Sequence, residues 1–321
     1  ERVEIGYLWG KGYSQRAIAK AMGRGTSTIG DELKRNSVKG RYDPRKAHHK
    51  AYVRRKYAKY QGMKIVGNGA LHKEITARLY DDQSPEAIAG YIRRTNKLLS
   101  ISKNAIYRFI ASVYGRRVEA HRRKRRRRRG GKRRRTAALS NRTFIDKRPA
   151  YIAERTRAGD AEGDFIASGR SGRGMLLVVV DRKTRITFLE RILPVSISRM
   201  EEACLKVKTR FPEWKSMTTD NDILFQRHER LASLLGIRIF FCHPYHSWEK
   251  GTVEQTNQVI RRDVPKGSNI SGYSKRFIAR VEAKLNRRPM KCLAFQTPHE
   301  ALRTCRRRRR NKKRPQQGCP D

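Results

Sequence analysis

The sequence is dominated by one stretch, residues 122–135, in which 12 of 14 residues are Lys or Arg. Such a block repels itself and has nothing apolar to bury, so it cannot contribute to a folded core. We therefore predict a basic disordered linker over residues 121–143 that separates two folded parts of the chain. A second basic run closes the sequence, and a disordered basic tail is predicted over residues 303–321.

The net charge indicates the kind of partner. The chain of 321 residues has 77 Lys and Arg against 29 Asp and Glu, a formal net charge of +48. The excess is +29 over residues 1–143, +11 over 144–302 and +8 over 303–321, so the front and the tail are expected to hold a polyanion. A membrane surface is the alternative, but no basic helix with a wide apolar face and no bilayer-spanning apolar run appears.

The cysteines favour a reducing compartment. The five cysteines are scattered, without the paired spacings of zinc or redox sites. They are Cys204, Cys242, Cys292, Cys305 and Cys319. His243 and His246 lie close to Cys242, but their spacing is poor for zinc, and no zinc site is predicted.

Residues 1–36 show the pattern of a helix-turn-helix. Ser14 precedes a helix with apolar periodicity, Gly23-Arg24-Gly25 forms a turn, and another helix is predicted over Thr26–Arg35. The first residues of that last helix are expected to reach base edges in the major groove, and its final cations to lie near phosphate. The candidate DNA contacts are Arg24, Ser27, Thr28, Lys34 and Arg35. With a basic connector, this domain is predicted to cover residues 1–65.

A second copy of this pattern is predicted over residues 66–120. Ser84 and Pro85 stand at the start of one amphipathic helix, and residues 102–107 start another. The candidate DNA contacts here are Ser102, Lys103 and Asn104. Triplets of short helices also occur as plain packing units, so the DNA-binding interpretation depends on the positive charge of this part of the chain.

Three acidic residues fall on one predicted strand. Residues 159–166 show the alternation of a strand in which Asp160, Glu162 and Asp164 share a face, because side chains two positions apart point the same way. Each is a candidate for a site on that face. Asp181 also ends a strand-like run, but it is better interpreted as the first residue of a hairpin turn.

Two more carboxylates are placed on other elements. Asp220 ends the Thr-rich strand-like run at 215–220, and Glu254 lies on the second turn of a later helix. An amphipathic helix near 225–235 and a buried strand at 237–242 lie between them.

The order of these elements predicts the fold. Runs at 175–180 and 185–192 follow the first strand and complete a three-stranded antiparallel meander. Helix, strand, helix, strand and helix come next, which is the order of the ribonuclease H-like fold. We therefore predict an α/β catalytic domain over 144–302, with a mixed five-stranded sheet and flanking helices, preceded by the all-α tandem helix-turn-helix domains.

Eight short segments are similar to a known family. They are residues 159–166, 176–181, 219–221, 243–245, 251–257, 264–267, 285–289 and 297–300. Through them the chain resembles the DDE transposases of the retroviral-integrase superfamily, most closely the insertion-sequence thirty family of bacterial mobile elements. Between Asp220 and Glu254 lie 33 residues, a spacing that matches the family.

The resemblance implies a catalytic and metal-binding triad of Asp164, Asp220 and Glu254. The residues alone leave Asp160 and Glu162 open as alternatives, and the family position selects Asp164. Carboxylate oxygens suit Mg²⁺ or Mn²⁺, and two ions are expected, one for each oxygen of an in-line attack on a phosphodiester. The implied reaction is strand cleavage by water, then transfer of the freed 3′ hydroxyl to other DNA.

The resemblance also implies partners. The expected partners are double-stranded DNA, both the terminal inverted repeats of an element and its target, and at least one further copy of the chain, because two ends must be joined. No membrane partner is implied. The implied location is the bacterial cytoplasm, at the nucleoid.

Some positions depart from the family pattern and leave other functions open. Ala161 stands where Trp is usual, Asp222 where Gly is usual, Leu224 where an acid is usual and Gln83 where Trp is usual. None is a proposed ligand. They keep open a catalytically inactive DNA-binding regulator of the same element. Ribonuclease H activity on RNA–DNA hybrids shares the fold but does not need two sequence-reading modules.

The helix of Glu254 carries further candidates. Lys250, Asn257 and Arg261 flank Glu254 at helix spacing and are predicted DNA contacts, with a solvated helix face as the alternative. His228 occupies a position where the family also has His and is a candidate for contact with the active site.

Overall fold

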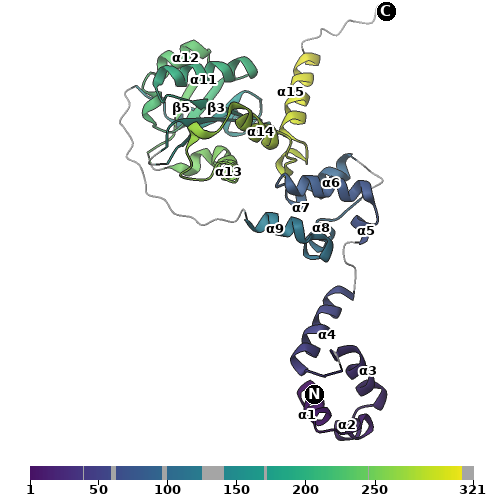
Figure 1. The fold of residues 1–321 in the computed structure, drawn as a ribbon. Helices are drawn as coiled ribbons and strands as arrows, with labels where there is room; N and C mark the ends of the chain where they lie inside the picture. The colour runs from purple at the N-terminus through teal and green to yellow at the C-terminus, as the bar shows by residue number, and fades with distance from the viewer. Residues whose placement is uncertain are drawn as a thin grey trace, which may run out of the picture. The chain divides into compact units, whose positions relative to one another are not determined.

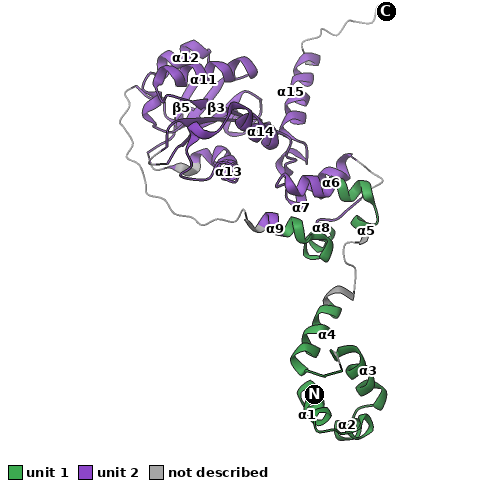
Figure 2. Cartoon of the chain, viewed as in Figure 1, with its two compact units in different colours: residues 1–74, 104–119 green, residues 75–103, 120–321 purple. Residues whose placement is uncertain are grey.

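The computed structural model describes residues 1–38, 40–58, 63–95, 100–124, 141–169, 172–244 and 246–312. These residues belong to two compact units. Unit 1 comprises residues 1–74 and 104–119, and unit 2 comprises residues 75–103 and 120–321 (Figure 2). Each unit is described by itself.

The first three helices of unit 1 form a helix-turn-helix with its own core. They are α1 Arg2–Gly10, α2 Gln15–Ala21 and α3 Thr26–Asn36. Ile5, Ile18 and Ile29, one from each helix, are buried in a common cluster. The Ser14 hydroxyl accepts a hydrogen bond from the Ala17 N–H at 3.3 Å and caps α2. The helix start predicted at Ser14 is therefore present.

Further helices lie among the described residues from 44 to 124. They are α4 Pro44–Ala58, α5 Met63–Val66, α6 Gly69–Tyr80, α7 Pro85–Thr95, α8 Lys103–Ala111, the 3₁₀ helix η1 Val113–Gly115 and α9 Arg116–Lys124. Ser84 Oγ accepts a hydrogen bond from the Ala87 N–H at 3.2 Å, and Pro85 is the first residue of α7. The helix starts predicted at Ser84 and near Ser102 are present, and the boundary between the units passes through α6 and α8.

Five strands form one mixed sheet in unit 2 (Figure 1). They are β1 Asp160–Ala167, β2 Met175–Asp181, β3 Thr187–Ile192, β4 Ser216–Thr219 and β5 Arg238–Phe241. The strand order is β3-β2-β1-β4-β5, with β1, β2 and β3 paired antiparallel and with β4 and β5 added parallel to β1. The predicted ribonuclease H-like fold is confirmed.

Helices cover both faces of this sheet. One face carries α11 Ile197–Arg210 and α12 His228–Leu235, and the other carries α13 Gly251–Ile260 and α14 Lys275–Asn286 (Figure 1). Strand β2 is buried along its whole length: Leu177 and Val179 belong to the first core, Val178 and Val180 to the second. This burial on both sides explains why β2 is a continuous apolar run in the sequence.

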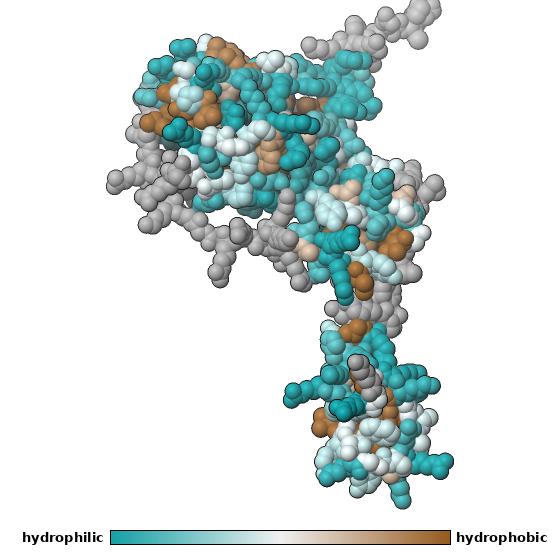
Figure 3. Space-filling model, in the orientation of Figure 1, coloured by the Kyte–Doolittle hydropathy of each residue, from teal (hydrophilic) through white to brown (hydrophobic). Residues whose placement is uncertain are grey.

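Short elements connect the strands and the long helices of unit 2. They are η2 Ile145–Lys147, α10 Ala150–Ala153, η3 Ile223–Phe225, η4 Ser247–Lys250, η5 Ile270–Gly272 and η6 Lys291–Leu293. Hydrophilic residues cover most of the face seen in Figure 3. Within the described ranges, no helix is both long enough and apolar enough to cross a membrane.

The basic ends of the folded parts are more helical than the sequence predicted. α9 continues to Lys124, and α15 Pro298–Lys312 extends well beyond residue 303, where a disordered tail was expected. Arg and Lys have good helix propensity, and the buried residues Ala301 and Leu302 nucleate a helix that further residues extend at little cost. The rest of the predicted linker and tail, 125–140 and 313–321, lies outside the described residues.

Candidate active site

Asp160 and Asp181 are buried acids with structural partners. Asp160, the first residue of β1, accepts hydrogen bonds from Arg157 Nε at 2.9 Å and from Ser216 Oγ at 2.6 Å. Asp181 closes the turn after β2 by accepting a hydrogen bond from Thr184 Oγ1 at 2.6 Å, which is the predicted hairpin role. Burial raises the pKa of the Asp181 carboxyl. Both acids therefore stabilise the sheet.

Glu162 connects the sheet to α13. Its carboxylate is 1% exposed and accepts hydrogen bonds from Arg182 Nε at 3.1 Å and from the Val253 N–H at 2.9 Å. The Val253 N–H belongs to the first turn of α13, where a carboxylate is favourable. Glu162 therefore fixes the start of the helix that carries Glu254.

Asp164 lies on β1, and Asp220 follows the last residue of the neighbouring parallel strand β4. The register pairs Glu162 of β1 with Thr218 of β4, and each acid comes two residues after its member of that pair. Lys250, the last residue of η4, places its Nζ 3.2 Å from Asp164 Oδ1 and 3.3 Å from Asp220 Oδ2. The structure thus brings these two predicted carboxylates together around one cation.

Lys250 differs from its predicted place on an exposed helix face in contact with phosphate. The residue is 5% exposed. Burial by itself lowers the pKa of the Lys250 ammonium, but the carboxylates of Asp164 and Asp220 raise this pKa above its ordinary value. Burial raises the pKa of Asp164 in turn, and the Lys250 charge opposes that rise. Lys250 is therefore the internal counter-ion of the acid cluster.

Glu254 and Asn257 face this cluster from α13. Burial raises the pKa of the Glu254 carboxyl, Lys250 opposes the rise, and the negative charge of Asp164 adds to it. Asn257, one turn further along α13, donates a hydrogen bond from Nδ2 to Asp164 Oδ2 at 2.5 Å. The predicted third acid is thus close enough to Asp164 for their charges to interact.

An open groove gives access to Asp164 and Asp220. Its volume is about 1270 Å³, and Arg261 and Lys266 also line it. Burial lowers the pKa of the Arg261 guanidinium, and the Asp164 charge opposes this effect. Acids beside cations suit a phosphodiester, because the cations can hold the phosphate oxygens while the carboxylates act at the reacting centre.

The oxygen atoms of the cluster suit a hard divalent cation. Asp220 Oδ1 and Asn257 Oδ1 are buried and have no hydrogen-bond partner in the part of the chain that the structure describes. A buried acceptor is costly unless something satisfies it. Carboxylate and amide oxygens are ligands that Mg²⁺ and other hard cations accept. The residues present therefore fit Mg²⁺ or Mn²⁺.

Two other acids near the cluster, Asp222 and Glu249, have structural partners. Asp222 caps η3, because its Oδ1 accepts a hydrogen bond from the Leu224 N–H at 3.0 Å. Glu249 accepts the His243 N–H on Oε2 at 2.9 Å, and its side chain is only 15% exposed. Sequence reasoning missed Glu249 as a partner of His243, although its spacing from that residue was visible.

The predicted DNA contacts at the front of the chain are on exposed surface. Arg24, Ser27, Thr28, Lys34 and Arg35 are exposed on α3 or just before it. Arg24 pairs with Glu1, and Arg35 Nη2 lies 3.6 Å from Asp31 Oδ2. Ser102, Lys103 and Asn104, at the start of α8, are exposed as well.

His228 has a packing role. It is 7% exposed, and its ring meets Phe241 edge-on with 5.0 Å between the ring centroids. Its Nε2 lies 3.2 Å from the Asn141 carbonyl oxygen. These contacts give His228 a packing role and do not support the predicted contact with the active site.

The ribonuclease H-like fold with its groove, together with the relatives described next, supports an enzyme of the polynucleotidyl transferase type. A family model described as "Helix-turn-helix domain" matches residues 1–36. The chain is 35% identical over 302 residues to the transposase for insertion sequence element IS4351 of Bacteroides fragilis, with 90% of each chain covered. It is 32% identical over 320 residues to transposase InsI for insertion sequence element IS30A of Escherichia coli (strain K12), with 94% of this chain and 82% of that one covered. The chain belongs to the IS30 family of insertion-sequence transposases.

Two solved retroviral structures are similar to part of the chain. The catalytic core domain of BIV integrase is 17% identical, with 47% of this chain and 98% of that chain covered and a TM-score of 0.38. The HTLV-2 integrase catalytic core domain, in complex with magnesium and in dimeric form, is 17% identical, with 45% and 97% covered and a TM-score of 0.35.

Proposed function

We propose that this transposase cleaves and joins DNA at the ends of its insertion sequence, with Asp164, Asp220 and Glu254 as its catalytic and metal-binding triad. The observation that carries the proposal is the pairing of Asp164 and Asp220 around Lys250 in a groove that Arg261 also lines. Two Mg²⁺ or Mn²⁺ ions, bound by the three carboxylates, would neutralise charge on the entering and leaving oxygens of an in-line displacement.

The residues around the triad hold it in place. Asn257 orients the Asp164 carboxylate through its Nδ2, and Glu162 fixes the first turn of α13, from which Glu254 projects. Arg261 and Lys266 hold phosphates of the DNA strand in the groove. A small error in the position of any reacting group lowers the rate strongly, so these positioning residues matter as much as the ligands.

The helical front of the chain would select the DNA. Ser27 and Thr28 at the start of α3 reach base edges of the terminal inverted repeat, while Lys34 and Arg35 contact phosphate. Ser102, Lys103 and Asn104 at the start of α8 supply a second set of contacts. Because two element ends and a target must meet, the working complex contains at least two copies of the chain.

The experiment is a cleavage and strand-transfer assay on linear DNA that carries the element's own ends, with Mg²⁺ present. The variants are Asp164→Asn, Asp220→Asn and Glu254→Gln, which remove charge and keep shape. Asp222→Asn is the matched control, because Asp222 is a neighbouring acid that caps η3. We expect each triad variant to lose at least about a thousandfold in rate, the scale of one strong electrostatic contribution, and the control to keep most of its activity.

A second outcome identifies the regulator function instead. Binding of the ends by the wild type, without cleavage by any version of the protein, would mean that the chain acts as a DNA-binding regulator. Ala161 of β1, where the family usually has Trp, is 1% exposed and belongs to one of the two cores of the sheet.

A further inference from the structure

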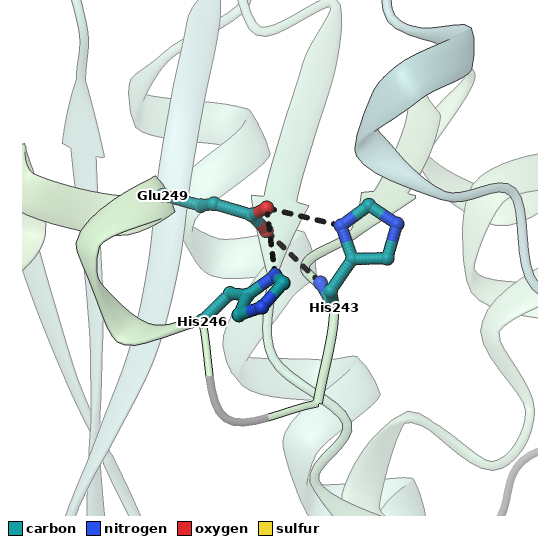
Figure 4. A group of neighbouring side chains, drawn as sticks. All are labelled: His243, His246 and Glu249. Carbon is teal, nitrogen blue, oxygen red and sulfur yellow. Dashed lines mark hydrogen bonds and ion pairs between the residues drawn. The ribbon is translucent and has the colours of Figure 1, made fainter.

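Two histidines and a glutamate converge at the junction of β5 and η4 (Figure 4). His243 Nδ1 lies 3.0 Å from Glu249 Oε1, and His246 Nδ1 lies 3.5 Å from the same oxygen. One potential ligand atom from each of the three residues lies within 4.8 Å of the others. The sequence predicted no zinc site here, because the spacing of His243 and His246 near Cys242 is poor for zinc and Glu249 was not considered with them.

These separations are those of a metal site. Zn²⁺ binds imidazole nitrogen and carboxylate oxygen at about 2.0–2.1 Å, so neighbouring ligand atoms of a tetrahedral site are about 3.3 Å apart. The two nitrogen-to-oxygen distances at Glu249 lie on either side of that value. Two imidazoles and one carboxylate suit Zn²⁺ and its neighbours in the first transition row and are a poor set for Mg²⁺.

The surroundings of His243 prepare it as a ligand. Its Nε2 lies 2.8 Å from Asp146 Oδ2, and its ring is stacked on Phe144 with 5.3 Å between centroids and 4° between planes. A carboxylate on the outer nitrogen is the usual second partner of a metal-bound histidine. With the proton of the neutral ring on Nε2, the lone pair on Nδ1 points toward Glu249 Oε1 and is available to a cation.

A cation bound by these nitrogen and oxygen atoms would take the place of the ring protons. His246 Nδ1 is directed at the same Glu249 oxygen, so one carboxylate oxygen faces a ring nitrogen from each histidine. The other oxygen of Glu249 is already occupied by the backbone N–H of His243, which leaves Oε1 for the cation. We propose that His243, His246 and Glu249 bind a transition-metal ion of the Zn²⁺ class, with one coordination position left for water or a further ligand.

The consequence is a structural clamp next to the active site. His243 follows the end of β5, and Glu249 immediately precedes Lys250 and the start of α13. The ion would hold these two segments together and so fix the turn from which Lys250 and Glu254 project. This role is distinct from the Mg²⁺ chemistry proposed for the triad and does not depend on it.

The test uses Co²⁺ as the probe, because Co²⁺ bound by imidazole in a tetrahedral site absorbs strongly in the visible range. The full-length protein is stripped with a chelator and titrated with Co²⁺ in excess Mg²⁺, which occupies the carboxylate cluster. The variant is His243→Ala with His246→Ala. The matched control is His48→Ala with His49→Ala, which removes two imidazoles from the exposed surface of α4.

The expected result is a saturating visible band at one equivalent of Co²⁺ in the wild type, in the control and in Glu254→Gln, and no band in the His243/His246 variant. Asp146→Asn, which keeps all three ligands, should weaken the affinity by about tenfold or more, and it gives a second readout if the double variant does not fold. Equal bands in the wild type and the His243/His246 variant, or no band in the wild type, would overturn the proposal.

Discussion

Lys250 Nζ lies 3.2 Å from Asp164 Oδ1 and is buried, so a lysine holds the position beside the acids where a metal cation is proposed to act. The same ammonium is 3.3 Å from Asp220 Oδ2. In the absence of metal this single charge partly neutralises two carboxylates that would otherwise repel each other. Lysine and metal therefore compete for the same oxygens.

Replacing this lysine should strengthen metal binding. We expect Lys250→Met to raise the affinity for Mg²⁺ by about tenfold. The substitution removes a positive charge that pairs with the ligand carboxylates and repels the metal, and such a charge is worth on the order of 1 kcal/mol or more. Isothermal titration calorimetry of the full-length protein measures this, with Lys266→Met, a cation of the same groove, as the control. Unchanged or weaker binding by Lys250→Met would show that the ammonium does not compete with the metal.

The raised pKa of Glu254 predicts a pH-dependent effect on stability. Burial raises this pKa above 4.5, the value for an unhindered carboxyl, so the folded protein favours the protonated acid. The stabilisation by that proton is complete below about pH 4.5 and is lost as the pH rises through the raised value. Glu254→Gln should therefore raise the melting temperature of the metal-free protein at neutral pH, and raise it by less in acid. An equal gain at both pH values would contradict this account, and thermal unfolding across the pH range measures it.

Glu162 should matter for folding rather than for binding metal. Removal of one partner from a buried ion pair costs about 3–5 kcal/mol, and Glu162→Ala leaves Arg182 buried without its carboxylate. Urea unfolding followed by circular dichroism measures the loss. Glu202→Ala, which breaks the exposed pair with Arg199, should cost less than about 1 kcal/mol. Similar midpoints for the two variants would mean that Glu162 is not a structural anchor.

The two ends of α3 should affect DNA binding differently. Lys34→Ala should weaken binding to repeat and scrambled DNA alike and lower the salt slope by about 1, because one phosphate contact is lost. Ser27→Ala with Thr28→Ala should weaken binding to the repeat alone. Fluorescence anisotropy at several salt concentrations separates the two effects. A uniform loss from the Ser27/Thr28 variant would assign those residues to phosphate instead.

Periodicity in the sequence was enough to predict the sheet. The alternation around Asp164 and the continuous apolar run at 175–180 each reflect which faces of the strand are buried. The apolar pattern of a few consecutive residues is enough to predict this. The same alternation could not separate Asp164 from Asp160 and Glu162. That distinction depends on Arg157, Ser216 and Arg182, which come from other elements.

The place of Lys250 could not be predicted for the same reason. A lysine near a helix start normally extends into water. Lys250 is buried instead, because the parallel pairing of β1 with β4 brings together two acids that contact its ammonium group. Glu249 and His243 likewise meet through the turn after β5. The high charge of residues 303–321 predicted disorder, but α15 continues to Lys312. The buried side chain of Leu302 anchors this helix, and the sequence does not show that burial.

The most direct test of the triad is a switch in metal preference. Asp220→Cys replaces a hard oxygen ligand by sulfur, which Mg²⁺ accepts poorly and softer Mn²⁺ accepts better. We expect this variant to cleave element ends in Mn²⁺ but not in Mg²⁺, whereas the wild type should cleave in both. Cleavage by Asp220→Cys in Mg²⁺ at the wild-type rate would contradict the account, because Asp220 would then not be a metal ligand.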